Sequence, residues 1–142
     1  MEVSGGLHYI LRADAIRIDV PRGRGDRERT VDELRRLPSG TTVVLADAAL
    51  GSRRRSRRLA RSADVRIERE LLAIPSVATP VYAVEDSPGA VESFWTCFAT
   101  VPAGVSAPAL PVAVAIRLVA LLRAWALVGA AVPGRFTIGR RA

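Results

Sequence analysis

The first apolar residues of the chain alternate with polar ones in two short stretches. Residues 7–11 and 16–20 both place bulky side chains at every second position. This period is typical of β-strands, and residues 12–14 are enough for a turn between them. We therefore predict a hairpin that ends at Pro21, followed by a charged loop containing glycine over residues 22–29.

A helix and a buried strand are predicted next. Thr30, with Glu33 three residues later, forms the pattern of a capping box and predicts a short helix over residues 31–37. Residues 41–46 form a nearly continuous apolar run between turn residues. Strands buried on both faces have this composition, so we expect residues 41–46 to be a central parallel strand.

The chain then predicts a second helix and two further strands. Ser52 is a suitable N-cap for a helix over residues 52–63. Residues 65–73 and 81–86 alternate as strands do, and the seven residues between them contain two prolines. This linker suits a long antiparallel connection rather than a tight turn.

Two apolar helices and a short strand are expected after residue 86. Ser87 followed by Pro88 is typical of a helix start, and Val91, Phe94 and Trp95 recur at helical spacing. Cys97 lies near the edge of this apolar face, and we interpret it as a packing residue. Residues 112–132 lie between two prolines and predict one long helix, before a strand over residues 135–138.

The predicted helix over residues 112–132 would be about 31 Å long, close to the ~30 Å hydrocarbon core of a bilayer. Arg117 and Arg123 would each cost about 2.5–3.5 kcal/mol near its centre, so insertion is not favoured. One bulky seam follows a 4-3-4-3-4 spacing and needs an apolar partner. Three partners remain open: the domain's own sheet, a second copy of the chain, or a lipid surface with the arginines at headgroup level. The seam contains Val114, Leu118, Leu121, Trp125, Val128 and Val132.

Composition indicates one globular domain with an excess of positive charge. The chain has 142 residues, 49% of them apolar and 25% charged, and a net charge of +7. That charge suggests an anionic partner, such as a membrane surface or nucleic acid. Every basic residue is an arginine, as a GC-rich coding sequence would also produce, so we rank nucleic acid lower. One cysteine and no signal-peptide pattern favour a cytoplasmic protein, with peripheral membrane attachment left open.

The helix predicted over residues 52–63 carries a cluster of arginines that local helix propensity does not explain. Like charges four residues apart repel, and cations in a first turn oppose the helix dipole. The cluster is either an anion-binding site, in which guanidinium forks bind phosphate, or a solvated face of a helix that covers the sheet. The candidate anion-binding residues are Arg53, Arg54, Arg57, Arg58 and Arg61.

No other group of residues predicts chemistry. The Gly23-x-Gly25 pair has Glu28 where the third glycine of a dinucleotide-binding loop would stand. Asp47 follows the central strand, where it could bind a ligand or cap the next turn. His8 lacks the spacing of a metal site. We therefore predict no catalytic, cofactor-binding or metal-binding residues.

Residues 34–45, Leu-Arg-Arg-Leu-Pro-Ser-Gly-Thr-Thr-Val-Val-Leu, resemble the helix, proline, glycine and strand that precede the fifth strand of class I S-adenosylmethionine-dependent methyltransferases. The arginine-rich helix and the stretches 65–73 and 81–84 are similar to the last helix and closing antiparallel hairpin of that fold. The resemblance covers residues 31–86. It implies the C-terminal half of such a domain, without its cofactor loop and ribose-binding acid.

We therefore expect a single α/β domain with a partial Rossmann-like sheet and a closing antiparallel hairpin, followed by two apolar helices. Its parts are residues 1–29, 30–86 and 87–142. The function that this implies is a non-catalytic or partner-dependent half-domain, with S-adenosylmethionine bound only if a partner completes it. The alternatives are a basic membrane-surface or nucleic-acid-binding module that uses residues 53–61, and an enzyme assembled across a dimer.

Overall fold

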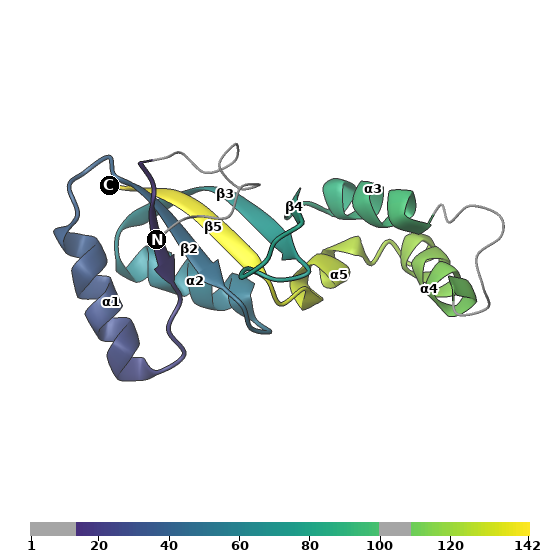
Figure 1. The fold of residues 1–142 in the computed structure, drawn as a ribbon, viewed down its shortest axis with the longest axis horizontal. Helices are drawn as coiled ribbons and strands as arrows, with labels where there is room; N and C mark the ends of the chain where they lie inside the picture. Colours follow the sequence, from purple (N-terminus) through teal and green to yellow (C-terminus); the bar gives the residue numbers. More distant parts are fainter. Residues whose placement is uncertain (1–13, 100–108) are drawn as a thin grey trace.

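The computed structural model describes residues 14–99 and 109–142, and its fold is α/β, as the sequence predicts. In these two ranges, five strands form one mixed sheet, with helices on one face and beside it (Figure 1). The elements in chain order are β1 (Ile16–Asp19), α1 (Arg24–Arg36), β2 (Thr42–Asp47), α2 (Ser52–Ser62), β3 (Val65–Ile74), β4 (Tyr82–Glu85), α3 (Pro88–Ala99), α4 (Ala109–Leu121), α5 (Trp125–Ala131) and β5 (Arg135–Arg141).

The order of strands across the sheet is β1-β2-β5-β3-β4. Strands β1 and β2 are parallel and are joined through α1, while β5 runs antiparallel to both β2 and β3. Strand β3 is therefore parallel to β2, to which α2 connects it. These helix-connected parallel strands form the partial Rossmann-like arrangement expected from the sequence.

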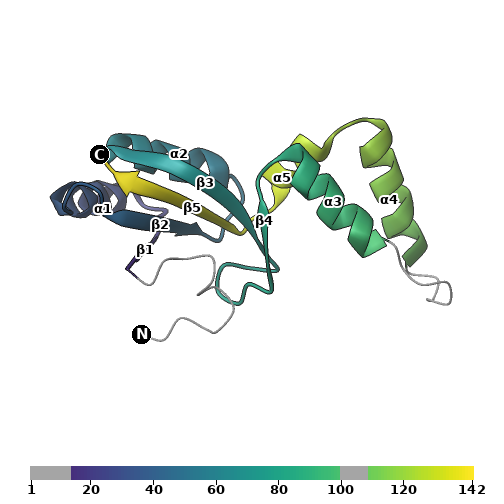
Figure 2. The same ribbon diagram turned by 90° about the horizontal axis from the view of Figure 1, so that it is seen from above.

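Strand β2 is an interior strand, and all six of its residues are buried. On one face Val43 and Leu45 pack with Leu34 of α1 and Leu59 of α2. On the other face Val44 and Ala46 pack with residues of β3 and β5 and with Val77 from the β3–β4 loop. Figure 2 shows α1 and α2 on one side of the sheet and this loop on the other. The prediction of a strand buried on both faces is confirmed, in a sheet that is mixed rather than all parallel.

The N-terminal part differs from the prediction. Strand β1 is confirmed, but it pairs with β2, and the other strand of the predicted hairpin lies outside the described residues. The predicted charged loop over residues 22–29 is wrong because α1 already begins at Arg24. Asp26 in the first turn and arginines in the last suit the helix dipole. Thr30 is not an N-cap: its hydroxyl donates to the Asp26 carbonyl oxygen (2.8 Å) within the helix.

The predicted antiparallel pairing of residues 65–73 with 81–86 is confirmed by β3 and β4. The sequence did not predict that β5 lies between β2 and β3. Pairing Val44 with Ile138 on one side and Leu71 with Phe136 on the other makes β5 the strand that joins the two halves of the sheet.

Helices α3, α4 and α5 form a helical lobe beside the β4 side of the sheet (Figure 2). The predicted start of α3 is confirmed, because the Ser87 hydroxyl accepts a hydrogen bond from the Ala90 amide (3.3 Å). The single helix predicted over residues 112–132 is wrong. The chain turns at Arg123, which has a φ of 50°, and this turn separates α4 from α5.

The apolar seam predicted on that helix is divided by the turn. Trp125 and Val128 pack inside the lobe with Val91, whereas Val114, Leu118 and Leu121 are exposed. Cys97, which the sequence analysis interprets as a packing residue, is exposed. No helix within the described ranges has the length and apolar character that crossing a bilayer requires.

A buried arginine links the sheet, α2 and the lobe. The side chain of Arg135, at the start of β5, is fully buried, and its Nη1 donates to Oδ2 of Asp86, which is 5% exposed. Its Nε donates to the Ser52 hydroxyl at the start of α2 (3.3 Å), and Nη2 donates to the Gly129 carbonyl oxygen in α5 (3.1 Å). One guanidinium therefore binds three segments that are distant in sequence.

Replacing Asp86 with Asn should lower the free energy of unfolding by about 3–5 kcal/mol. The substitution leaves the Arg135 charge buried without its counter-ion, and a broken buried ion pair carries a cost of this size. Urea unfolding followed by circular dichroism measures the loss.

The matched control is Glu68→Gln, which also converts a carboxylate to an amide. Glu68 pairs with Arg140 at 3.3 Å, but the two side chains are 42% and 45% exposed. An exposed pair contributes about 0–1 kcal/mol. Equal losses in the two variants would contradict a special role for the buried pair.

Replacing Gly139 with Ala should destabilise the protein by about 1–3 kcal/mol, as overpacking does. A Cβ at Gly139 would lie 2.7 Å from the Arg66 carbonyl oxygen of the neighbouring β3. Gly25→Ala in α1 is the control, because a Cβ there meets nothing within 4 Å. Thermal unfolding that ranks the Gly139 variant at or above the Gly25 variant would argue against the position of β5 beside β3.

Candidate anion-binding site

Helix α2 presents its arginines because its other face is buried against the sheet. Leu59 and Ala60 are fully buried, and Ala63, directly after the helix, packs with them against β2 and β3. The helix begins after Gly51, whose φ of 76° makes glycine the favoured residue there. Ser52 is thus the first helical residue and not the N-cap that the sequence predicts.

Arg55 is occupied by the loop that precedes α2. Its Nε and Nη2 donate to the two carboxylate oxygens of Asp47 (2.9 and 2.8 Å), and it also donates to the carbonyl oxygens of Leu50 and Ala49. Asp47 is 3% exposed and accepts a further hydrogen bond from the Ala49 amide (3.0 Å). Of the two roles open to Asp47, this geometry matches capping of the turn.

Two of the five predicted anion-binding arginines already have carboxylate partners. Arg57 makes a bidentate pair with Glu70 of β3, and Arg53 lies 3.2 Å from Asp86. Hydrogen bonding to Glu70 is the main cause that raises the pKa of Arg57 above its ordinary value. Arg57 is therefore charged throughout the physiological pH range, and its charge is partly neutralised.

The other three predicted residues, Arg54, Arg58 and Arg61, are exposed and make no ion pair within the described part of the chain. Their guanidinium groups are available to solvent and to ligands. Because arginine binds phosphate through paired N–H donors, such groups are suited to bind phosphate oxygens.

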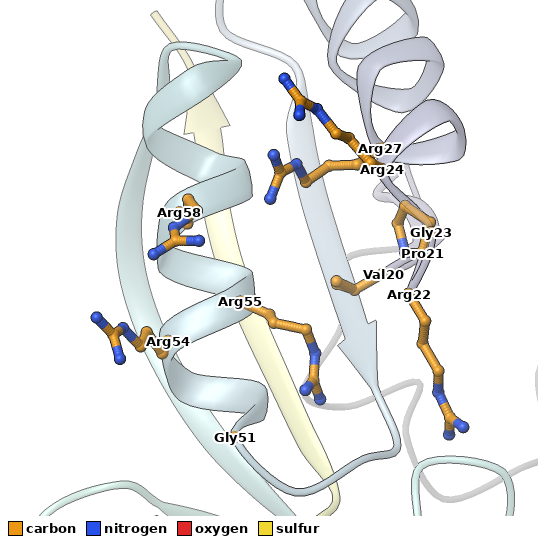
Figure 3. A pocket seen from close by; sticks show the side chains of 10 residues that line it. All are labelled: Val20, Pro21, Arg22, Gly23, Arg24, Arg27, Gly51, Arg54, Arg55 and Arg58. Carbon is orange, nitrogen blue, oxygen red and sulfur yellow. The ribbon is translucent and has the colours of Figure 1, made fainter.

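Two of these three arginines, Arg54 and Arg58, line a hollow between α1 and α2, which we call the α1–α2 hollow. Its volume is about 520 Å³, within the usual range of small-molecule sites. Figure 3 shows Arg24 and Arg27 of α1 reaching toward α2, while Arg55 points to the loop below. The hollow is lined by Val20, Pro21, Arg22, Gly23, Arg24, Arg27, Gly51, Arg54, Arg55 and Arg58.

A second hollow lies on the other side of the same arginines, toward the helical lobe. Its volume is about 730 Å³, and it shares Gly51, Arg54 and Arg58 with the first. Arg61 lines only the second hollow, together with Ala130 of α5. The outer face of α2 is therefore a continuous basic surface between α1 and the lobe.

The structure places all five predicted arginines around the second hollow and adds three that the sequence analysis missed. Arg22, Arg24 and Arg27 come from the region that the sequence analysis interpreted as a solvated loop. Arg24 lies 3.4 Å from Glu28, whereas Arg22 and Arg27 have no carboxylate partner in the described ranges. The three-residue spacing of Arg24 and Arg27 is compatible with one face of a helix and could have indicated them. The two glycines beside Arg24 favoured the interpretation as a loop instead.

The arrangement is suited to hold an anion rather than to transfer protons. No acidic side chain lines either hollow among the described residues, so guanidinium groups dominate the local potential. The described ranges contain no cluster of three metal-ligating side chains. Comparisons with protein-family models, curated proteins and solved structures gave no match.

The same substitution should lower the free energy of unfolding at one of two adjacent arginines and leave it nearly unchanged at the other. Arg55→Gln should lower the free energy of unfolding by about 2–3 kcal/mol, because the buried Asp47 carboxylate loses its charged donors. Arg54→Gln should change it by no more than about 0.5 kcal/mol, because Arg54 is exposed and lies among like charges. Chemical denaturation of both variants makes the comparison.

Each variant is the control of the other, since both remove one positive charge from the same turn of α2. Stability losses of similar size would mean that Arg54 is held by the fold and is not open to a ligand.

Proposed function

We propose that this chain is a non-catalytic α/β module that binds phosphate-bearing ligands through the open arginines of α1 and α2. The observation that carries the proposal is the α1–α2 hollow, which is lined by six arginines and by no acidic residue of the described chain. Two of the six have carboxylate partners, since Arg55 pairs with Asp47 and Arg24 lies near Glu28, but the other four have none in the described ranges. These four guanidinium groups repel one another, and a multivalent anion removes that repulsion.

The arginines of α2 fall into two groups, and this difference supports the same proposal. Arg55, Arg57 and Arg53 pair with carboxylates that are at most 11% exposed, as a structural role requires. Arg54, Arg58 and Arg61 make no such ion pair within the described ranges, and each adds positive charge to an already cationic helix. Helix stability alone disfavours this pattern, so binding of an anion is the better explanation.

We also propose that the module is similar to the C-terminal half of a methyltransferase domain. Three parallel strands joined by helices, with the antiparallel β5 between the second and the third, fit that resemblance. The cofactor loop and ribose-binding acid of that family precede the matching region. We therefore assign no catalytic residue and expect S-adenosylmethionine to bind only where a partner chain supplies the missing half.

Inorganic triphosphate should bind to the full chain, and the Arg54→Gln/Arg58→Gln variant should bind it about tenfold more weakly or worse. Both residues line both hollows, and charge-assisted hydrogen bonds to phosphate are worth about 1.5–3 kcal/mol each before solvent screening. Isothermal titration calorimetry measures the affinity, which should also fall with added salt.

Arg35→Gln/Arg36→Gln is the matched control, because it removes the same charge from the far end of α1. An equal loss of affinity in this variant would show that net charge, not the hollow, attracts the anion. A parallel titration with S-adenosylmethionine should give no binding heat, and tight binding would overturn the non-catalytic assignment.

A further inference from the structure

Exposed apolar side chains are concentrated in the helical lobe. Val114, Leu118 and Leu121 lie four and three residues apart on one side of α4, and they are 50%, 52% and 79% exposed. Leu122 in the turn and Leu127 on α5 are also largely exposed, at 73% and 72%. The opposite side of α4 packs on the lobe through Ile116, Val119 and Ala120. The exposed stripe is therefore not needed to hold the lobe together.

The charge of the chain after α3's Glu92 has one sign. Residues 93–142 contain no Asp or Glu. Arg117 and Arg123 are exposed on the same lobe as the exposed leucines. The one acidic residue within the lobe's helices is Glu92 of α3, and the charged neighbours on α4 and in the turn after it are cationic. Such an apolar surface suits an anionic, apolar partner.

The lobe is continuous with the basic face of α2. Ala130 of α5 lines the second hollow beside Arg54, Arg58 and Arg61. Leu127 lies three residues before Ala130 and so belongs to the same side of α5. Exposed apolar side chains and open arginines thus border each other.

We infer that this combined surface docks on an anionic lipid membrane, with the leucines of α4 and α5 among the acyl chains and the arginines at the lipid phosphates. The inference rests on the proposed function, because the same arginines bind phosphate in both. A second copy of the chain fits less well, since pairing two such surfaces would bring open arginines together without carboxylates.

Vesicle co-sedimentation tests the inference with the full chain. Vesicles of phosphatidylcholine and phosphatidylglycerol should bind the protein, and vesicles of phosphatidylcholine alone should not. Leu121→Ser/Leu122→Ser should weaken binding about tenfold or more, because two exposed apolar side chains no longer leave water. Val81→Ser is the control, since Val81 is 69% exposed but lies in the β3–β4 connection.

Tryptophan fluorescence gives a second readout. The chain has two tryptophans, Trp95 in α3 and Trp125 in α5, so both lie in the lobe. Phosphatidylglycerol vesicles with brominated acyl chains should quench them, and less so in the Leu121→Ser/Leu122→Ser variant. Vesicle binding that is unchanged in this variant, or that occurs without quenching, would overturn the inference.

The remaining outcomes separate the two proposals. Triphosphate binding without vesicle binding would overturn the membrane inference and leave the proposed function standing, whereas loss of both would end both. Dimers that dissociate in the Leu121→Ser/Leu122→Ser variant, seen by sedimentation velocity without vesicle binding, would assign the surface to a second copy. Tighter binding to duplex DNA than to vesicles at equal phosphate concentration would also overturn the inference.

Discussion

The architecture depends on one buried guanidinium. Arg135 begins the strand that joins both halves of the sheet, and its side chain connects Asp86, Ser52 and Gly129. An arginine in such a place is costly to desolvate, so it is stable only while all of its acceptors are in position. The sheet, the start of α2 and the helical lobe are for this reason fixed relative to one another by the same guanidinium group.

The elements that the sequence predicted well are those whose pattern is local. The apolar run of β2, the alternation in β3 and β4, and the Ser87-Pro88 start of α3 each carry their own signal. Strand β5 shows the limit of this reasoning. Its short alternating pattern predicts a strand, but the pairing with β2 and β3 depends on contacts with residues far away in the sequence. Arg135 gives no sign of being buried, because its counter-ion lies 49 residues away.

The errors at α1 and in the lobe have physical causes too. Two glycines beside charged residues indicate a loop, yet Gly25 lies within α1, where burial of Leu34 against β2 outweighs its low helix propensity. In the lobe, the turn at Arg123 places a non-glycine residue at positive φ, which no local pattern indicates. Burial of Trp125 against Val91 and Leu72 accounts for the turn, because a straight helix could not pack both halves on the lobe.

Only part of the candidate site could be predicted, because the sequence does not show which side chains contact one another in the fold. Arginine spacing identified the basic helix, but only the fold distinguishes Arg55, held by Asp47, from Arg54 beside it. The sequence gives the number of cationic side chains, whereas the structure shows which of them have a carboxylate partner. The contribution of α1 also required the fold, since Arg27 reaches the hollow across the gap between the two helices (Figure 3).

The central position of β5 has a consequence for how the chain reaches its native state. Until residues 135–141 arrive, β1 with β2 and β3 with β4 are two small, separate ribbons, and neither buries enough apolar surface to persist alone. Closing the roughly fifty-residue excursion between β4 and β5 carries an entropic cost that falls if the lobe is already compact. We therefore expect slow, highly cooperative folding in which assembly of the lobe comes before zipping of the sheet.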